Sequence, residues 1–461
     1  MPSSPIPNLE EGPYPLRNGN RVRPLIGGEP AFRRICEAVE AANHSVWVTV
    51  AFLEAAFEFP DGRGHLFDVL DRAADRGIDV RALFWHSPEA WDFEPGNHFL
   101  GSEEHHALLA DRGARFVARW DGLDKTYCHH QKSWLIDVGR VGEVVFVGGI
   151  NLNNASVTAH PFALCEGGSR SHTQDVYCEL AGPVATDVHH NFAQRWNGAS
   201  ERSKPLGAWP APDRVDDLAF PEKLSPEVGD VPVQISRTIR RGFYDDDTAP
   251  PGGQAISPTS GEYGVLRQYV AAIGAAREAI YFENQFLMQS DIFDAIEAAL
   301  ERGVRVLAMV PAAPSALVAA TRQASQGPRL FEQLERLVAH PRFSFVGLAV
   351  NRGADCEFVY VHSKLAIIDD VWATIGSANL WNRSFFGDTE LNASFWHAET
   401  TRRLRGDLLS AHHGGDLSTL SMADALDALA LRAEENRVRQ RRGEPIEGHA
   451  LALDAASWGA K

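Results

Sequence analysis

Two stretches of this 461-residue chain share one pattern of hydrophobic and polar positions. Residues 65–85 and residues 291–311 each carry apolar residues at helical spacing, then an Arg-Gly pair, then an apolar run. This pattern predicts a helix, a glycine stop and a strand. A further strand candidate precedes each stretch, at residues 45–52 and 279–286, so each half of the chain is predicted to begin with a β-α-β unit.

The repeat indicates an internal duplication with an irregular segment between its two copies. Prolines are frequent and periodicity is weak between residues 199 and 232, which is typical of a crossover or linker. The last periodic segment, Ser421–Arg442, predicts a helix. We therefore divide the chain into an N-terminal extension, a first half, a linker with a loop, and a second half that ends in this helix. These four segments are residues 1–24, 25–200, 201–256 and 257–461.

A short motif, H-x-K-x-x-x-x-D, occurs once in each half. In an extended strand residues i and i+2 face the same side, so His130 projects together with Lys132, and His362 together with Lys364. The apolar residues that follow each lysine predict a buried strand. Each motif thus places a titratable imidazole beside a fixed positive charge.

The aspartate that ends each motif falls on the opposite face of its strand from the histidine. We therefore interpret Asp137 and Asp369 as structural residues. Each motif is followed by a turn of small residues that ends in an asparagine, which is Asn151 in the first half and Asn379 in the second.

These motifs and their flanks resemble the phospholipase D superfamily, over roughly residues 25 to 450. The second half carries, in chain order, Ile280-Tyr281-Phe282-Glu283-Asn284-Gln285-Phe286, His362-Ser363-Lys364, Gly376-Ser377-Ala378-Asn379, Arg383-Ser384 and Gly387-Asp388-Thr389-Glu390-Leu391-Asn392. The first half carries Gln174-Asp175, Gly182-Pro183 and Phe192-Ala193-Gln194-Arg195-Trp196-Asn197. The resemblance implies an α/β fold of two duplicated phospholipase D-like halves, each a mixed β-sheet flanked by helices, with the active site at their interface.

The resemblance also implies a covalent phosphohistidine intermediate that forms without a metal or another cofactor. We expect His130 to be the nucleophile and His362 to exchange protons with the leaving and attacking alcohols. Each histidine should have a carboxylate on its other ring nitrogen. By motif position we assign Glu390 to His362 and Asp175 to His130.

The remaining polar residues of the motifs are expected to bind the substrate phosphate. Positive charge and N–H donors stabilise the non-bridging oxygens of a phosphodiester as the transition state forms. We assign this role to Lys132, Lys364, Asn151 and Asn379.

Aromatic residues close to the Asn379 turn are candidates for contact with the lipid or its headgroup, because loops of this kind often carry specificity. These candidates are Trp381, Phe385 and Phe386, whereas Trp134 and Trp372 fall at core positions of the predicted strands. The histidine doublets outside the motifs show no convergent ligand geometry, and we interpret them as surface or helix residues rather than as a metal site. They are His105-His106, His189-His190 and His412-His413.

The composition fits a folded soluble protein, with 44% hydrophobic and 23% charged residues. No basic start with an apolar run and no uninterrupted stretch of about 18 apolar residues occurs, so we expect a cytoplasmic protein with at most peripheral membrane contact. The formal net charge of −17 disfavours nonspecific binding to nucleic acid. In a cytoplasmic protein the scattered cysteines should be reduced thiols. They are Cys36, Cys128, Cys165, Cys178 and Cys356.

Four functions are compatible with this pattern. The leading hypothesis is a phospholipase D-type phosphodiesterase that hydrolyses or transfers the phosphatidyl group of a phospholipid. The alternatives are a phosphatidyltransferase similar to cardiolipin synthase, a phosphodiesterase acting on nucleic acid, and a non-catalytic member that binds membranes or proteins. The acidic balance speaks against the nucleic-acid enzyme, and the two intact histidine-lysine pairs speak against the non-catalytic protein. The sequence gives no indication of the oligomeric state.

Overall fold

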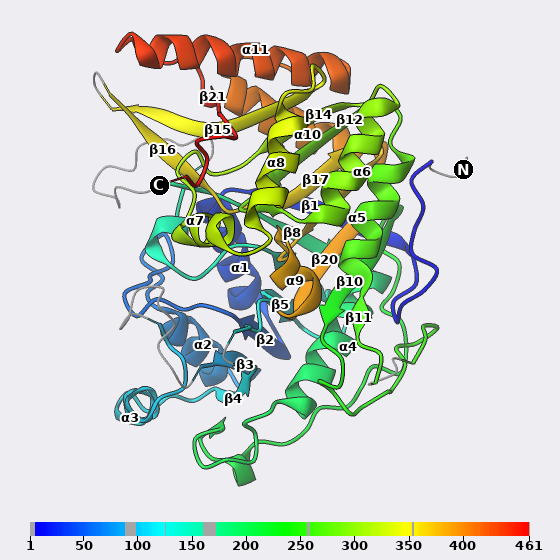
Figure 1. Ribbon diagram of the computed structural model, residues 1–461. Helices are drawn as coiled ribbons and strands as arrows, with labels where there is room; N and C mark the ends of the chain where they lie inside the picture. The colour runs from blue at the N-terminus through cyan, green and yellow to red at the C-terminus, as the bar shows by residue number, and fades with distance from the viewer. Residues whose placement is uncertain are drawn as a thin grey trace.

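The structure is a computed structural model that describes residues 5–87, 98–124, 126–159, 172–255, 259–352 and 355–460. It contains two similar halves, with the second half above the first in Figure 1. Each half is a mixed β-sheet flanked by helices, which confirms the predicted α/β fold with an internal duplication. None of the helices in these residue ranges is both long and apolar enough to cross a bilayer.

The sheet of the first half is antiparallel except that β2 pairs in parallel with β3 and β3 with β4. The parallel pairs require crossover connections, and helix α2 (Leu66–Asp75) supplies the one between β2 and β3. In spatial order its strands are β1 (Arg17–Ile26), β8 (Val176–Ala181), β6 (Val144–Gly148), β5 (Ser133–Ile136), β2 (Ser45–Val50), β3 (Asp79–His86), β4 (Val117–Gly122) and β9 (Ala208–Trp209).

The sheet of the second half repeats this order and these directions. Its strands are β10 (Val231–Ile239), β20 (Glu390–Phe395), β18 (Trp372–Gly376), β17 (Lys364–Ile368), β12 (Ala279–Asn284), β14 (Arg305–Met309), β15 (Phe343–Arg352) and β21 (Ala450–Ala452). Short β11 (Glu262–Tyr263) pairs with β10, and β16 (Asp355–Val361) pairs with β15. The two sheets join where β1 pairs with β10 in antiparallel fashion.

Helices cover the outer face of each sheet, and the two sheets share a central core into which α4 (Pro183–Gly198), α10 (Ala398–His413) and α11 (Met422–Arg441) also pack. Successive side chains of a strand point to opposite faces of the sheet, which explains this division. In the first motif strand, Trp134 and Ile136 enter the outer core of the first half while Leu135 enters the central core. The helices of the first half are α1 (Gly28–Ala41), α2, α3 (Glu103–Asp111) and α4 (Pro183–Gly198). Those of the second are α5 (Gly264–Ala275), α6 (Ser290–Glu301), α7 (Ala316–Gln323), α8 (Gly327–Val338), α9 (Asn382–Phe386), α10 (Ala398–His413) and α11 (Met422–Arg441).

The predicted repeat corresponds to α2–β3 in the first half and α6–β14 in the second, and the predicted C-terminal helix is α11. The predicted boundaries of the halves differ from the structure at two strands. Strand β1 begins inside the segment predicted as an N-terminal extension, and β10 lies inside the predicted linker. The sequence pattern did not predict strand β1, because some of its buried residues are polar. One of them, Arg17, forms an ion pair with Asp187 at 2.7 Å.

The two motif aspartates fasten equivalent strands, which confirms their structural interpretation. Asp369 accepts hydrogen bonds from the backbone N–H groups of Arg277 (2.8 Å), Glu278 (2.9 Å) and Ala279 (2.9 Å) at the start of β12. Asp137 accepts equivalent bonds at the start of β2, and both aspartates have φ of 54°. Aspartate tolerates this left-handed conformation better than most residues.

Replacing Asp369 with alanine should lower the free energy of unfolding, because it leaves several backbone donors without their acceptor and strains the backbone. We expect a loss of about 1–3 kcal/mol. Urea unfolding followed by circular dichroism measures it. The matched control is Asp213→Ala, which removes an exposed carboxylate and should change the stability by no more than roughly 0.5 kcal/mol. Equal stability of the two variants would contradict the anchoring role.

Candidate active site

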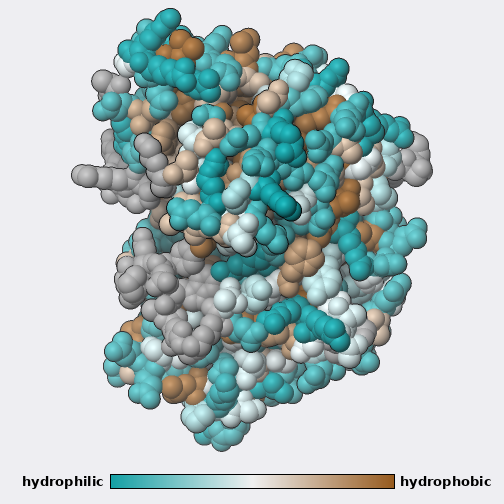
Figure 2. Space-filling view, in the orientation of Figure 1, coloured by the Kyte–Doolittle hydropathy of each residue, from teal (hydrophilic) through white to brown (hydrophobic). Residues whose placement is uncertain are grey.

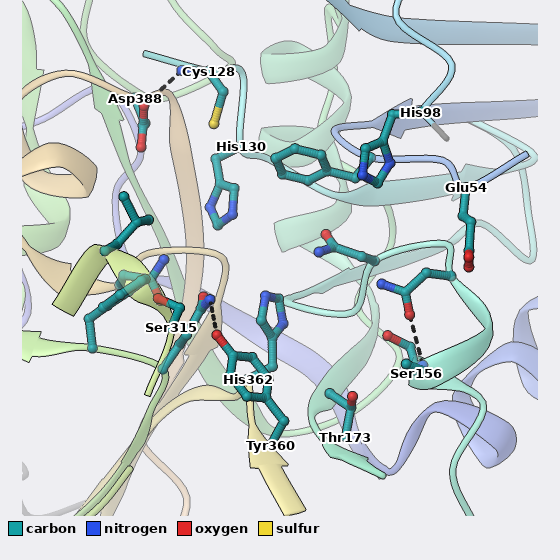
Figure 3. Close-up of a pocket in the computed structure, with 18 of the residues that line it drawn as sticks. Glu54, His98, Cys128, His130, Ser156, Thr173, Ser315, Tyr360, His362 and Asp388 are labelled. Atoms are coloured by element: carbon teal, nitrogen blue, oxygen red, sulfur yellow. Dashed lines mark hydrogen bonds between the residues drawn. The ribbon is translucent and has the colours of Figure 1, made fainter. Parts of the chain in front are cut away.

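The two motif histidines line one cavity of about 650 Å³ between the halves (Figure 3). Both side chains are buried from solvent, with 7% of the surface of His130 and of His362 exposed. The first half contributes Phe52, Glu54, His98, Cys128, His130, Asn151, Asn153, Asn154, Ala155, Ser156 and Thr173. The second half contributes Gln285, Phe286, Ser315, Leu317, Tyr360, His362, Asn379, Trp381, Arg383 and Asp388.

Backbone hydrogen bonds tie the chain before each motif to the opposite half. The N–H group of His130 donates to the carbonyl of Thr389 at 3.0 Å, and the N–H of Thr389 donates to the carbonyl of Cys128 at 3.1 Å. On the other side, the N–H of His362 donates to the carbonyl of Gln174 at 2.8 Å. Short strand β7 (Thr173–Gln174) runs parallel to the end of β16 just before His362. A segment of the other half therefore forms hydrogen bonds with the backbone at each motif.

These contacts between the halves correct the predicted pairing of the histidines with their carboxylates. Nδ1 of His130 lies 3.0 Å from Glu390, and Nδ1 of His362 lies 2.6 Å from Asp175. The sequence prediction assigned Glu390 to His362 and Asp175 to His130, which is wrong. Both carboxylates follow the segments that cross the interface, so each reaches the histidine of the opposite half.

The surroundings of His130 define its tautomer. Nδ1 of His130 faces the carbonyl oxygen of Ser377 at 3.0 Å as well as Glu390, and a carbonyl can only accept a hydrogen bond. Nδ1 therefore carries a proton, and the lone pair of the neutral ring is on Nε2. A lone pair on Nε2 makes this nitrogen available for attack on an electrophile in the cavity.

Burial and nearby cations keep both imidazoles neutral. The pKa of His130 lies well below its usual value because of burial first and the positive charges of Lys132 and Lys364 second. Burial and Lys364 lower the pKa of His362 to about 3, against the opposing effect of Asp175. Each histidine thus senses the lysine of both motifs, so the two motifs share one electrostatic environment.

The two lysines are buried beside their own histidines. Nζ of Lys132 donates to the carbonyl of His130 at 2.7 Å, and Nζ of Lys364 donates to the carbonyl of His362 and to the side chain of Gln285 at 3.1 Å. Burial lowers the pKa of Lys132 to about 8 and that of Lys364 to about 7. These ammonium groups have shed their hydration, so an anion in the cavity would gain strong attraction from them.

Close packing at one glycine brings the second-half lysine beside the first-half carboxylate. A Cβ atom at Gly149 would lie 2.7 Å from Oδ1 of Asp175 and 3.0 Å from Cδ of Lys364. No larger residue fits there without displacing one of these side chains. The small-residue turn after the first motif is thus required for the two halves to approach each other at the site.

The carboxylate of Glu390 is completely buried. It accepts a hydrogen bond from the hydroxyl of Ser377 at 2.5 Å in addition to its contact with His130. Burial raises the pKa of Glu390 to about 7, although the charge of Lys132 opposes this shift. Glu390 therefore binds a proton more readily than an ordinary glutamate at neutral pH.

The two asparagines predicted to bind phosphate both line the cavity. Asn151 and Asn379 occupy equivalent positions after their turns. The side-chain oxygen of each has no hydrogen-bond partner within the described part of the chain. A free amide oxygen accepts a hydrogen bond from a ligand, whereas a phosphate oxygen would bind the Nδ2 donors, so the phosphate role of the two asparagines stays a prediction.

The three aromatic candidates lie in different environments. Trp381 lines the cavity and packs against Phe286, with ring centroids 4.9 Å apart. Phe385 is fully buried in the outer core of the second half, so its predicted contact with substrate is wrong. Phe386 is 44% exposed and is absent from the cavity lining, so its contact with lipid stays a prediction. The short helix α9 (Asn382–Phe386) begins directly after Trp381 and keeps Phe385 and Phe386 out of the cavity lining, whereas Arg383 of the same helix lines the cavity.

Several lining residues were not identified from the sequence, including Glu54, His98, Asn153 and Tyr360. Only Tyr360 carried a usable signal, because it precedes His362 by two residues and therefore shares its side of the chain. The histidine doublets lie at helices, but His412 of α10 is completely buried and contacts Glu283 at 2.8 Å. The described cysteines are free thiols, and Cys165 lies outside the described residues.

Comparisons with known proteins agree with this geometry. A family model described as "Phospholipase D" matches residues 154–299, and one described as "Cardiolipin synthase, PLD-like domain" matches residues 269–410. Among solved structures, phosphatidylserine synthase from Haemophilus influenzae Rd KW20 has a TM-score of 0.55 at 13% sequence identity, with 84% of each chain covered. At this identity the likeness concerns the fold alone.

Curated relatives cover most of the chain. A cardiolipin synthase of Geobacillus sp. (strain WCH70) is 24% identical over 86% of this chain and 67% of its own length. Phospholipase D alpha 2 of Oryza sativa subsp. japonica is 24% identical over 84% of this chain and 62% of its own length. Cardiolipin synthase A of Pseudomonas entomophila (strain L48) is 24% identical over 81% of this chain and 64% of its own length. The chain thus spans about two thirds of the length of these relatives.

Three findings support the same family. The motifs are duplicated, the sheets are duplicated, and known proteins match residues in both halves. Each would be weak in isolation, because a fold or a short motif can be shared by unrelated functions. Together they place the paired histidines and asparagines of both halves around one cavity, with a buried lysine beside each histidine. The chain therefore belongs to the phospholipase D superfamily.

Proposed function

We propose that the protein is a phosphatidyltransferase or phosphodiesterase that cleaves the phosphodiester of a phospholipid through a phosphohistidine. The observation that carries this proposal is the pair of buried imidazoles, each held by a carboxylate of the opposite half, that line one cavity. Two buried lysines beside them supply the positive charge that a phosphoryl group needs. The names of the relatives, cardiolipin synthase and phospholipase D, support a phospholipid as the substrate.

In the first step, Nε2 of His130 attacks phosphorus and forms a P–N bond. The P–O bond to the headgroup alcohol breaks, and His362, which must carry a proton on Nε2 at this stage, donates that proton to the leaving oxygen. The phosphate charge in the cavity favours this protonated form of His362, and Asp175 at 2.6 Å stabilises it. Lys132 and Lys364 attract the non-bridging oxygens.

In the second step, His362 removes the proton from water or from an acceptor alcohol. The resulting oxygen attacks phosphorus, the P–N bond breaks, and His130 regains its neutral form. Water gives hydrolysis and an alcohol gives transfer, so one site serves both reactions. Glu390 holds Nδ1–H of His130 through both steps and thereby keeps Nε2 directed to phosphorus.

We assign the nucleophile to His130 and the acid–base role to His362 on the basis of their carboxylates. A general acid needs a stabilised imidazolium, and the contact of His362 with Asp175 is the shorter of the two. His130 faces Glu390, whose raised pKa of about 7 leaves it partly protonated and less able to stabilise an imidazolium. A neutral His130 is the better nucleophile.

The surface and the cavity favour a lipid over a nucleic acid. Nucleic-acid phosphodiesterases use basic grooves, whereas this chain has a formal net charge of −17. The cavity has an apolar side with Phe286, Leu317 and Trp381. The face in Figure 2 is largely hydrophilic with hydrophobic residues scattered over it, as on most protein surfaces, so the preference for a lipid rests on the net charge and on the cavity rather than on this face.

Removing either histidine should abolish headgroup release. For His130→Ala and His362→Ala we expect a fall in kcat on the order of 10³-fold or more, because residues that act as a unit are each indispensable. Release of headgroup from phospholipid micelles measures it. The control His44→Ala removes an exposed imidazole and should keep full activity. Retention of most activity in either motif variant would refute the proposal.

Activity should decline as the pH rises, and at a lower pH than an ordinary lysine would cause. Burial lowers the pKa of Lys364 to about 7 and of Lys132 to about 8, and only the ammonium form attracts phosphate. Because kcat/KM reports the free enzyme, it should fall as the pH rises between these values, well below the usual lysine pKa of 10.5.

The matched variant for this pH dependence is Lys364→Arg. Its guanidinium stays charged at every accessible pH, so the alkaline midpoint should move upward even if the maximal rate falls. A profile of kcat/KM that stays flat to roughly pH 10 in the unmodified protein would contradict the role of the buried lysines.

A further inference from the structure

One end of the cavity carries a carboxylate that the proposed reaction does not use. This end, here called the Glu54 arm, is formed by Glu54, His98, Asn153, Asn154 and Ser156. In Figure 3, Glu54, His98 and Ser156 lie on one side of His130 and His362, and Ser315 and Asp388 lie on the other. A phosphodiester held between the histidines would direct one of its two substituents into this arm.

The Glu54 arm is built by hydrogen bonds within the first half. The backbone N–H of Asn154 donates to Oε2 of Glu54 at 2.9 Å, and the N–H of Glu54 donates to the carbonyl of Leu152 at 2.9 Å. Glu54 also forms a β-bridge with His98. The side chain of Asn154 donates to the carbonyl of Ala56 at 2.8 Å. These bonds hold the carboxylate in place before any ligand binds.

Among the residues that the structure describes, no cation forms an ion pair with Glu54. The other carboxylates of the site are each attracted by one: Asp388 forms an ion pair with Arg383 at 3.0 Å, and Glu390 and Asp175, which contact the neutral histidines, are attracted by the buried Lys132 and Lys364. A partly buried carboxylate with a single backbone donor retains free acceptor sites and an electrostatic preference for a cation.

The opposite side of the cavity is chemically different. Among the lining residues, the second half contributes Phe286, Leu317 and Trp381 and the ion pair of Arg383 with Asp388, whereas the first half contributes Phe52, whose ring centroid lies 5.7 Å from that of His98. This asymmetry orients the substrate, because the diacylglycerol part of a phospholipid is apolar next to its phosphate and the headgroup part is polar. The headgroup side of the phosphodiester then faces Glu54.

We propose that Glu54 is the specificity residue for the headgroup and that it selects an alcohol bearing an ammonium group, such as ethanolamine, over an uncharged or anionic alcohol. This inference rests on the proposed function. The ammonium can belong either to the leaving headgroup or to an incoming acceptor alcohol, because the two occupy the same side of phosphorus in turn. An acceptor with a negative charge, such as a second anionic phospholipid, is disfavoured by the same carboxylate.

The test compares the unmodified protein with Glu54→Gln, which keeps the shape and the acceptor oxygen for the Asn154 N–H but removes the charge. The substrates are phosphatidylethanolamine and phosphatidylglycerol with identical acyl chains in neutral detergent micelles, and the readout is the ratio of their kcat/KM values. Bis(p-nitrophenyl) phosphate reports cleavage without either headgroup. The control Glu58→Gln removes an exposed carboxylate of the same loop that does not line the cavity.

We expect the unmodified protein and Glu58→Gln to prefer phosphatidylethanolamine, and Glu54→Gln to lose about tenfold or more of that preference. Cleavage of bis(p-nitrophenyl) phosphate should remain unchanged in both variants. The same shift in ratio should appear when ethanolamine and glycerol compete as acceptors, and comparison of the two assays shows whether Glu54 acts on the leaving or the incoming alcohol.

Two results would overturn the inference while leaving the proposed function intact. One is an unmodified protein that cleaves phospholipids without preferring the ammonium headgroup. The other is a Glu54→Gln variant that slows all three substrates equally, which would indicate a structural role for Glu54. Failure of the unmodified protein to cleave any of the three diesters would overturn the proposed function itself, and the headgroup assignment with it.

Discussion

The exchange of chain segments between the two halves is the interaction on which the site depends. Hydrogen bonds from His130 to Thr389 and from His362 to Gln174 join backbones that belong to different halves. They place the carboxylate that follows each crossing segment beside the histidine of the other half. Each motif histidine contacts a carboxylate of the opposite half, so the site forms only when both halves fold and pack together.

This arrangement concentrates charge in a place from which water is largely excluded. Burial is the largest cause of the lowered pKa of both histidines and both lysines, and also of the raised pKa of Glu390. Desolvation of this kind is costly for a protein in its resting state. It is also what makes a site attractive for a phosphate anion, because the groups that meet the anion have no hydration shell to lose. The free-energy cost of burying these groups is thus linked to their ability to bind a phosphate.

Much of the fold could be predicted from the sequence, because hydrophobic periodicity reports which face of an element is buried. The β-α-β repeat, the motif strands and helix α11 (Met422–Arg441) follow from local patterns. Strands β1 and β10 did not, because polar side chains such as Arg17 are buried in one and prolines surround the other. Such interactions depend on partners far away in the chain and leave no periodic signal.

The candidate site shows the same division between local and distant information. Strand parity paired each histidine with its lysine, whereas the carboxylate partners were assigned to the wrong histidines because chain order cannot reveal a crossing between halves. Phe385 was expected at the substrate, but one turn of helix directs it into the core. Glu54 and His98 reach the cavity through the packing of loops, for which the sequence contains no spacing rule.

The central claim is that imidazoles from both halves act on a single phosphorus atom. A crystal structure of the protein with orthovanadate, which imitates phosphorus in the transition state, tests it most directly. The account predicts one vanadium atom bonded to Nε2 of His130, with an oxygen on its opposite side within hydrogen-bonding distance of Nε2 of His362. A vanadate bound by one histidine alone, with the other ring out of reach, would contradict it.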